Sequence, residues 1–214
     1  MIRAAALLVT SVAMLHCQSL QLAVVGNGPI RAGNTIQISL SLVGGSGSGI
    51  AGIEESITAS TGGTITVAAG PADTATGKTP HCEAVASGVY ICVDVALNAT
   101  TFADGIIHVY TLQIPANAAP GQSTVTLGNL AAVNAAGTPV AITGNTLNFT
   151  LASPISPCDL DGSGVTDALD LDLAIKQALG LATCTDLTGD GKCTVVDIQR
   201  VINAALGGAC RTGV

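Results

Sequence analysis

The sequence contains no tryptophan, and only two tyrosines and two phenylalanines occur among its 214 residues. Sites that bind sugars usually stack the sugar rings on exposed aromatic side chains. Some of the four aromatic residues (Tyr90, Phe102, Tyr110 and Phe149) must also fill a core. The shortage of aromatics therefore argues against carbohydrate binding.

Charge is also scarce. Charged residues make up 10% of the chain, the formal net charge is -7, and lysine and arginine form no cluster. Proteins that bind nucleic acid carry basic patches, so this class is excluded. Glycine, alanine, threonine and valine dominate instead, which is typical of secreted β structure rather than of an intracellular enzyme.

Catalytic motifs are missing as well. The sequence has no nucleophile elbow, phosphate-binding glycine loop or HExxH motif. His108 stands in an alternating strand pattern, where a packed or surface histidine is the ordinary interpretation. Glu54 and Glu55 are adjacent, so in a strand they point to opposite faces and cannot form an acid/base pair. We expect that the protein is not an enzyme.

Residues 1–19 resemble a secretory signal peptide. Arg3 supplies a positive start, residues 4–15 form a short apolar run, and Cys17-Gln18-Ser19 offers small residues at a cleavage site. The apolar run is too short to span a bilayer, so we expect no membrane span. A lipoprotein anchor at Cys17 is the alternative, although His16 fits such a signal poorly. We expect an extracellular or cell-surface protein.

The cysteines support this interpretation. Cleavage would leave six of the seven cysteines, and an even set in an exported chain suggests three disulfides. Cys82 and Cys92 are expected to pair locally. The other four allow three pairings, of which we favour Cys158–Cys210 with Cys184–Cys193. Free thiols or a zinc site are disfavoured, because no CxxC spacing occurs and residues 158–214 contain no histidine.

One acidic pattern occurs twice between Cys158 and Cys210, with the copies 27 residues apart. Positions 1, 3, 5, 9 and 12 carry oxygen-bearing side chains, position 6 is glycine, and position 7 would offer its backbone carbonyl. This is the ligand spacing of an EF-hand-type calcium loop. The alternative is a pair of acidic, glycine-rich turns without metal. The expected ligands are Asp159, Asp161, Ser163, Val165, Asp167 and Asp170, and then Asp186, Thr188, Asp190, Lys192, Thr194 and Asp197.

A helical pattern follows each loop. Apolar residues recur at i, i+4, i+7 and i+8, which predicts one apolar stripe, and a glycine ends each pattern. No amphipathic pattern precedes the first loop, where residues 153–157 contain two prolines. Each copy is therefore a loop followed by a helix. The matching residues are Leu171/Ile198, Ile175/Ile202, Ala178/Ala205 and Leu179/Leu206, with Gly180/Gly207 at the ends.

A tandem loop–helix pair with aspartate at position 12 resembles a dockerin, the calcium-folded module that binds cohesin domains. The resemblance covers residues 158–214. Ser163 and Thr188 replace residues that are usually acidic, so each loop lacks one carboxylate, yet we expect two calcium sites. In dockerins the positions before the closing aspartate often touch the cohesin. These are Ala168, Leu169, Val195 and Val196, which are either interface or helix-packing residues.

The preceding residues 20–152 alternate like the strands of an antiparallel sandwich. Segment 71–83 fits no strand and is expected to be a loop held by Cys82. Turn signals such as Ala119-Pro120-Gly121 separate most strands. The expected strands are 20–26, 34–43, 50–60, 64–69, 88–97, 106–114, 123–127 and 146–151.

Three segments of this part resemble a cohesin domain. Residues 31–35, Arg-Ala-Gly-Asn-Thr, are similar to the family's Pro-Gly-Asp-Thr segment before an alternating strand. Residues 49–53 are similar to its next strand, and residues 119–127 with 137–140 to its closing strands. The expected fold is mainly β with a small α module. A jelly-roll, cohesin-like sandwich would be followed by a proline-containing linker (153–157) and the two-loop, EF-hand-like dockerin module.

Together the two resemblances imply a function in assembly. A chain with a receptor-like sandwich and a plug-like module has both halves of a contact, and a stiff linker of about 15 Å hinders contact within one chain. We expect a secreted, non-catalytic protein that associates with neighbouring copies in a calcium-dependent way. Such head-to-tail contacts form rings or filaments. The alternative is an adaptor or substrate-binding protein whose dockerin-like end docks into a different extracellular scaffold.

Overall fold

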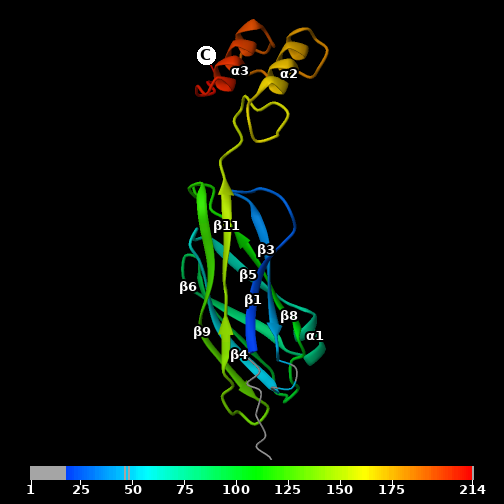
Figure 1. The fold of residues 1–214 in the computed structure, drawn as a ribbon, viewed down its shortest axis with the longest axis vertical. Helices are drawn as coiled ribbons and strands as arrows, with labels where there is room; N and C mark the ends of the chain where they lie inside the picture. The colour runs from blue at the N-terminus through cyan, green and yellow to red at the C-terminus, as the bar shows by residue number, and fades with distance from the viewer. Residues whose placement is uncertain (1–17, 46, 48, 214) are drawn as a thin grey trace, which may run out of the picture. The chain divides into compact units, whose positions relative to one another are not determined.

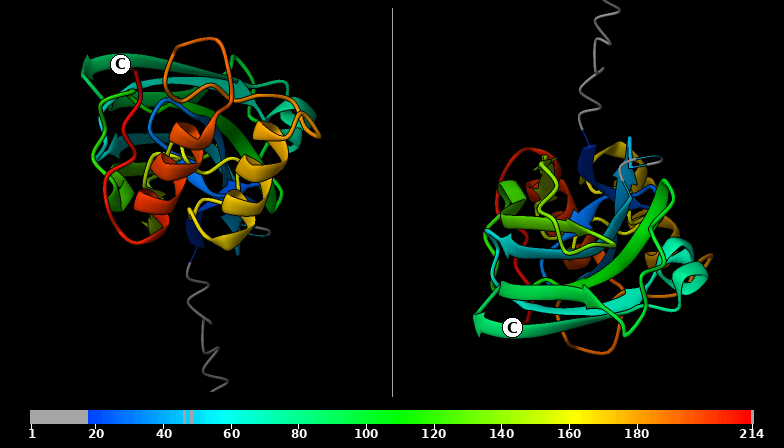
Figure 2. Two further views of the ribbon diagram at one scale, coloured as in Figure 1. Left: turned by 90° about the horizontal axis from the view of Figure 1, so that it is seen from above. Right: turned by 90° about the horizontal axis from the view of Figure 1, so that it is seen from below.

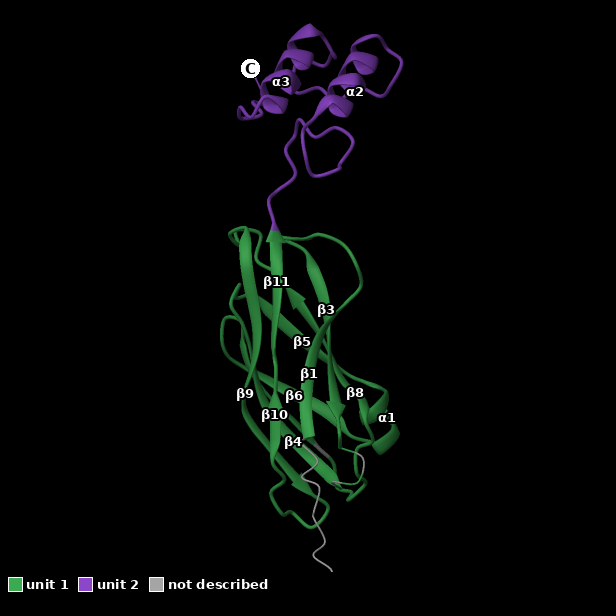
Figure 3. Cartoon of the chain, in the orientation of Figure 1, with its two compact units in different colours: residues 1–151 green, residues 152–214 purple. Residues whose placement is uncertain are grey.

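The computed structural model describes residues 18–213 apart from residues 46 and 48, and the chain divides into two compact units, residues 1–151 and 152–214 (Figure 3). The expected signal peptide lies outside the described residues except for Gln18 and Ser19, which open the first strand. No helix in the described part is both long and apolar enough to cross a membrane.

The first unit is a sandwich of two β-sheets (Figures 1 and 2). The five-stranded sheet has the order β10 (Ile142–Gly144), β1 (Gln18–Val25), β3 (Thr35–Val43), β8 (Gly105–Gln113), β5 (Thr64–Ala69). The six-stranded sheet has the order β2 (Ile30–Arg31), β11 (Thr146–Ala152), β9 (Gly121–Asn134), β4 (Ile50–Ala59), β7 (Val89–Val95), β6 (Thr79–Ala86).

In the five-stranded sheet, β1, β3, β8 and β5 pair with one another in antiparallel fashion, as the sequence predicts. The same holds for β11, β9, β4, β7 and β6 in the six-stranded sheet. The exception is β10, which pairs with β1 in parallel, with Gln18 opposite Ile142. The sandwich fold is therefore confirmed, with the parallel pair of β10 and β1 at one edge.

The core between the sheets follows from the alternation of the strands. On β3, every second residue from Ile36 to Leu42 is buried, whereas Thr35 and Gln37 are exposed. Tyr110 and Leu112 of β8 face the same interior. Burying an aliphatic side chain of this size stabilises a fold by about 1.5–3 kcal/mol. This core fixes the register of both sheets, because a slip of one residue would expose it.

Segment 71–83 is not the expected loop. Pro71–Thr76 forms a short helix, α1, with proline in its first turn and Gly77 in the left-handed conformation at its end. Strand β6 follows and pairs with β7 across the two-residue turn Ser87-Gly88, which places Cys82 opposite Cys92. The prediction failed because β6 is stabilised by its partner strand and its disulfide, not by its own alternation.

The second unit contains two helices, α2 (Ala168–Ala178) and α3 (Val195–Ala205), which lie side by side (Figure 2). Each begins and ends as the repeat predicts, with Gly180 and Gly207 in positive φ just past the last turn. The small core contains Cys158, Ala174, Leu187 and Val201, with Leu171 and Ile198 packed against it.

The predicted apolar stripes are only partly correct. Ile175, Leu179 and Leu206 are exposed, although the sequence pattern places them on the buried face. The buried face of α2 instead carries Ala174 and Gln177. The short helices have too few neighbours to cover a full stripe, and the loops occupy the remaining inner side.

The disulfides in the described part of the chain are Cys82–Cys92, Cys158–Cys210 and Cys184–Cys193, the pairing favoured from the sequence. The first lies within the sandwich, and the other two lie within the second unit. A core as small as that of the second unit usually needs such cross-links or a bound metal to be stable.

Candidate calcium loops and interaction surface

The first acidic loop brings three of its predicted ligands together. Carboxylate oxygens of Asp159, Asp161 and Asp170 lie within 4.8 Å of one another. Asp170 is fully buried and closes the loop, because its Oδ1 accepts from the backbone N–H of Leu160 (2.7 Å) and of Asp161 (3.0 Å). Its Oδ2 accepts from the N–H of Asp167 at 2.8 Å. The closing aspartate therefore fixes both the loop and the start of α2.

Asp159 supports a cation site in this loop. Its Oδ2 accepts from the N–H of Gly164 at 2.7 Å, while its Oδ1 is buried and finds no hydrogen-bond donor among the described residues. An unpartnered buried carboxylate oxygen beside two further carboxylates is costly unless a positive charge compensates it. Calcium is bound by oxygen ligands of this kind. The residues of the first loop thus fit the ion.

The other predicted ligands of the first loop form hydrogen bonds with backbone groups of the loop and of the start of α2. Asp167 is the N-cap of α2 and accepts from the N–H of Leu169 at 2.7 Å, so it is not among the three gathered carboxylates. Ser163 Oγ donates to the carbonyl of Val165 at 3.0 Å. The backbone N–H of Ser163, followed by its side chain, lowers the pKa of Asp161, which favours the ionised form.

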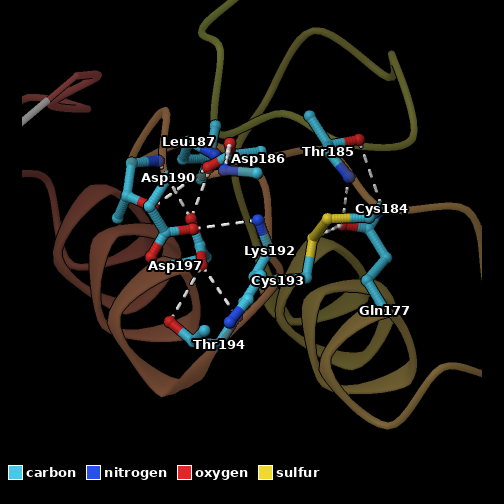
Figure 4. Close-up of a disulfide and its surroundings, with 12 residues drawn as sticks. Gln177, Cys184, Thr185, Asp186, Leu187, Asp190, Lys192, Cys193, Thr194 and Asp197 are labelled. Carbon is cyan, nitrogen blue, oxygen red and sulfur yellow. Dashed lines mark hydrogen bonds between the residues drawn. A yellow bond between two sulfur atoms is a disulfide. The ribbon is translucent and has the colours of Figure 1, made fainter.

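The second loop repeats the hydrogen-bond arrangement of the first around its closing aspartate (Figure 4). Asp197 is buried and accepts from the N–H groups of Leu187, Thr188 and Thr194, as Asp170 does in the first loop. Asp186 accepts from the N–H groups of Gly189 and Gly191 at 2.6 Å each. Its pKa is lowered, chiefly by the N–H of Gly191. The second loop is therefore also prepared to carry ionised carboxylates.

The two loops nevertheless differ at the predicted ligands. Within the described residues, no group of three acidic ligand atoms gathers in the second loop as it does in the first. Thr188 is buried and its Oγ1 donates to Asp186 Oδ1 at 3.0 Å, where a carboxylate would have added a ligand. Asp190 accepts from the N–H of Lys192 at 2.9 Å, and Thr194 is the N-cap of α3.

Two polar side chains that brace this unit were missed by the sequence analysis. Gln177 of α2 is buried, and its Oε1 accepts from the N–H of Thr185 at 3.1 Å, next to the Cys184–Cys193 disulfide (Figure 4). Arg200 Nη1 donates to the carbonyls of Leu187 (2.8 Å) and Arg211 (2.9 Å). A signal for Gln177 was its place on the inner face of α2, three residues after Ala174.

The four predicted interface residues are all exposed, so they are not helix-packing residues. Ala168 and Leu169 occupy the first turn of α2, and Val195 and Val196 occupy the first turn of α3. Leu169 is 65% exposed and Val195 is 74% exposed. We call these four residues the first-turn surface. They form two pairs of neighbouring exposed apolar residues, one pair on each helix, and exposed apolar side chains of this kind are candidates for interaction with another protein.

Comparison with known proteins relates the sandwich to cohesins. No protein-family model matches the sequence, and no curated protein matches it significantly. Among solved structures, a type I cohesin–dockerin complex from Clostridium thermocellum is 13% identical, with a TM-score of 0.54, covering 63% of this chain and 99% of that chain. The sixth cohesin of scaffoldin B from Acetivibrio cellulolyticus, in complex with a dockerin, is 17% identical, with a TM-score of 0.52, covering 63% and 99%.

A cohesin described as non-cellulosomal, from the archaeon Archaeoglobus fulgidus, is 10% identical, with a TM-score of 0.50, covering 64% of this chain and 92% of that chain. Identities this low show the fold alone. The chain therefore contains a cohesin-like β-sandwich, a fold that these proteins use for interaction with another protein in at least two of the three cases.

Proposed function

We propose that the chain is a secreted, non-catalytic assembly protein, whose second unit is a calcium-ordered, dockerin-like module that binds the cohesin-like sandwich of a neighbouring copy. The observation that carries this proposal is the first-turn surface. Its four apolar side chains are exposed at equivalent positions of the repeat, directly before the closing aspartates of the two acidic loops. The alternative is an adaptor that docks into a foreign scaffold.

Calcium would act by ordering the loops. Asp159, Asp161 and Asp170 would hold it in the first loop. In the second loop the carboxylates are Asp186, Asp190 and Asp197, at positions 1, 5 and 12 of the repeat. Bound calcium neutralises carboxylates that otherwise repel one another, and so contributes to folding. Because Asp170 also accepts from the N–H of Asp167, the N-cap of α2, loop order sets the position of Ala168 and Leu169.

The solved relatives support the sandwich as the receptor. The cohesins from Clostridium thermocellum and Acetivibrio cellulolyticus are described in complex with dockerins. A chain with a sandwich of this fold and a candidate plug can join copies head to tail. Contacts of this type close into rings if the rotation allows, and continue as filaments otherwise.

The first test is the size of the purified protein in millimolar calcium and again after chelation, measured by light scattering and electron microscopy. Particles or fibres that dissolve on chelation are the expected result. A monomer under both conditions would replace self-assembly with the adaptor function. Fibres that survive chelation would remove calcium from the assembly mechanism.

The second test uses the first-turn surface. The double variant Leu169→Glu with Val196→Glu places two charges on it and should abolish assembly while leaving calcium binding unchanged. Leu181→Glu is the matched control, because Leu181 is also exposed and lies beyond the other end of α2. Equal assembly by the double variant and the wild type would show that the contact lies elsewhere.

A further inference from the structure

Four ionisable side chains meet in the interior of the first unit, outside the site described above. Glu55 comes from β4, Asp73 from α1, Asp94 from β7 and His108 from β8, and none has any exposed surface. Strands β4 and β7 belong to the six-stranded sheet and β8 to the five-stranded sheet. This group, which we call the interior cluster, therefore links the two sheets and the helix that connects them.

The imidazole of His108 is oriented by one side of the cluster. Its Nδ1 lies 2.9 Å from Tyr110 Oη and 3.2 Å from Glu55 Oε1, and Tyr110 Oη donates to the same Glu55 oxygen at 2.5 Å. This arrangement turns Nε2 toward the opposite side. There it contacts Asp94 Oδ2 and lies 3.5 Å from Asp73 Oδ2.

That opposite side is incompletely bonded. Beyond the ion pair between Nε2 and Asp94 Oδ2 and the 3.5 Å contact between Nε2 and Asp73 Oδ2, the described residues offer the carboxylate oxygens of Asp73 and Asp94 no hydrogen bond. Buried carboxylates are normally paired, hydrogen-bonded or bound to a metal. The charge of the nearby Lys78 acts on both aspartates, but its Nζ makes its hydrogen bonds elsewhere, to Asn98 Oδ1 (2.9 Å) and to the carbonyl of Thr100 (2.7 Å). A compensating positive charge is needed between the two aspartates and Nε2.

We propose that Asp73, Asp94 and His108 hold a divalent transition-metal ion in the interior of the sandwich. One ligand atom from each lies within 4.8 Å of the others. Zinc binds carboxylate oxygen and histidine nitrogen at about 2.0–2.2 Å, so His108 Nε2 and Asp94 Oδ2, which touch in the structure, would separate slightly to admit an ion that also contacts Asp73. An imidazole nitrogen with two carboxylates suits zinc or a similar ion better than calcium, which prefers oxygen alone.

The contacts on Nδ1 support a ligand role for Nε2. Histidines that bind metals usually donate their other ring N–H to a carboxylate or a carbonyl, which fixes the ring and its tautomer. Glu55 occupies that position, and Tyr110 holds Glu55 in turn. Because the cluster is closed to solvent, the ion would not be catalytic. It would join β7 of one sheet to β8 of the other and hold α1 against both.

A protonated imidazole is the competing source of positive charge. Its Nε2–H can bond only one carboxylate closely, which in the structure is that of Asp94, whereas Asp73 Oδ2 lies 3.5 Å from Nε2. A bound ion would contact both carboxylates and Nε2 at the same time. The position of Asp73 therefore favours the metal.

The test is the metal content of the full chain produced with zinc in the medium and purified in excess calcium, which keeps the acidic loops of the second unit from retaining zinc. Mass spectrometry should find one zinc ion per folded chain. X-ray absorption at the zinc edge should show only nitrogen and oxygen ligands, including one imidazole. Folded protein without zinc would overturn the proposal, and so would a spectrum without imidazole.

Variants assign the ion to the cluster. Asp73→Asn and Asp94→Asn preserve side-chain shape and should each lose the zinc, whereas Asp159→Ala, in the first acidic loop, should retain it. Zinc retained by either Asn variant would contradict the assignment. If Asp94→Asn does not fold, the zinc content of Asp73→Asn, on the short helix α1, and the wild-type spectrum still test the assignment.

Discussion

At the scale of single residues, Gly70 lets two elements come close together because it has no side chain. Gly70 is the N-cap of α1, and its N–H donates to the carbonyl of Ile107 at 2.6 Å. A Cβ at this position would lie 2.4 Å from the carbonyl oxygen of Ile106, which real Cβ atoms do not approach. Glycine therefore lets α1 start directly on β8, three residues before Asp73 reaches His108.

Gly70→Ala should therefore destabilise the sandwich. The obstacle is backbone on a central strand, which cannot move aside as a side chain can, so we expect a loss of about 1–3 kcal/mol in the free energy of unfolding, as for other overpacked sites. Urea unfolding measures it. Gly52→Ala is the control, because its Cβ would meet mainly the movable side chain of Val133, at 3.1 Å. Equal losses in both variants would contradict this explanation.

At the scale of elements, each helix of the second unit shares an aspartate with the loop before it. Asp170 and Asp197 are the third residues of α2 and α3, and each also closes its loop. A reciprocal bond between the N-cap and the third residue satisfies two N–H groups of the helix start. Loop and helix are therefore one cooperative element, which explains why the sequence repeats them together.

Asp170→Ala should weaken both parts of this element. It removes a candidate calcium ligand and leaves the N–H groups of Leu160, Asp161 and Asp167 without their acceptor. Each buried donor left unpaired costs about 1–3 kcal/mol. Calcium titration calorimetry and helical circular dichroism should show weaker binding and a loss of helix.

The matched control for that variant is Asp172→Ala. Asp172 lies on the same helix, is mostly exposed, and pairs with Lys176 at 2.6 Å. Exposed pairs of this kind contribute little, so stability should change by less than about 0.5 kcal/mol. Wild-type calcium affinity in Asp170→Ala would remove the first loop from the list of calcium sites.

What the sequence predicts depends on whether the signal is local. The alternation in β3 and the glycines after α2 and α3 are local patterns, and both elements appear where they are expected. Strand β6 and the three-residue strand β10 depend on partners distant in the sequence, and they were missed.

The same distinction applies to the sites. The acidic loops are contiguous, so their spacing could be read directly. The interior cluster is assembled from four elements, and Asp73 comes from the segment expected to be a loop. The local indication of this cluster in the sequence was the alternation of β8, which places His108 on the same face as the buried Tyr110 and Leu112.

At the scale of the whole molecule, the chain has two separate cores. The sandwich core and the small core around Cys158, Ala174, Leu187 and Val201 share no residue. Residues 153–156, near the start of the second unit, form no helix or strand. Each unit should therefore unfold in its own transition.

Calcium should stabilise only one of these transitions. A ligand at one hundred times its Kd stabilises the state that binds it by about 2.7 kcal/mol. In scanning calorimetry, added calcium should raise the Tm of the second unit and leave that of the sandwich unchanged. A single transition, or equal shifts of both, would show that the units are coupled.

The edge strands of the two sheets affect whether the protein aggregates at high concentration. Two of the four edge strands, β2 and β10, have only two and three residues. The eight-residue edge strand β6 contains Pro80, which has no N–H to offer, and is cross-linked to its neighbour through Cys82. Short edges and prolines oppose the addition of foreign strands. At these three edges, crowded copies of the chain are thus hindered from pairing strand to strand, which leaves more specific contacts to determine how the copies join.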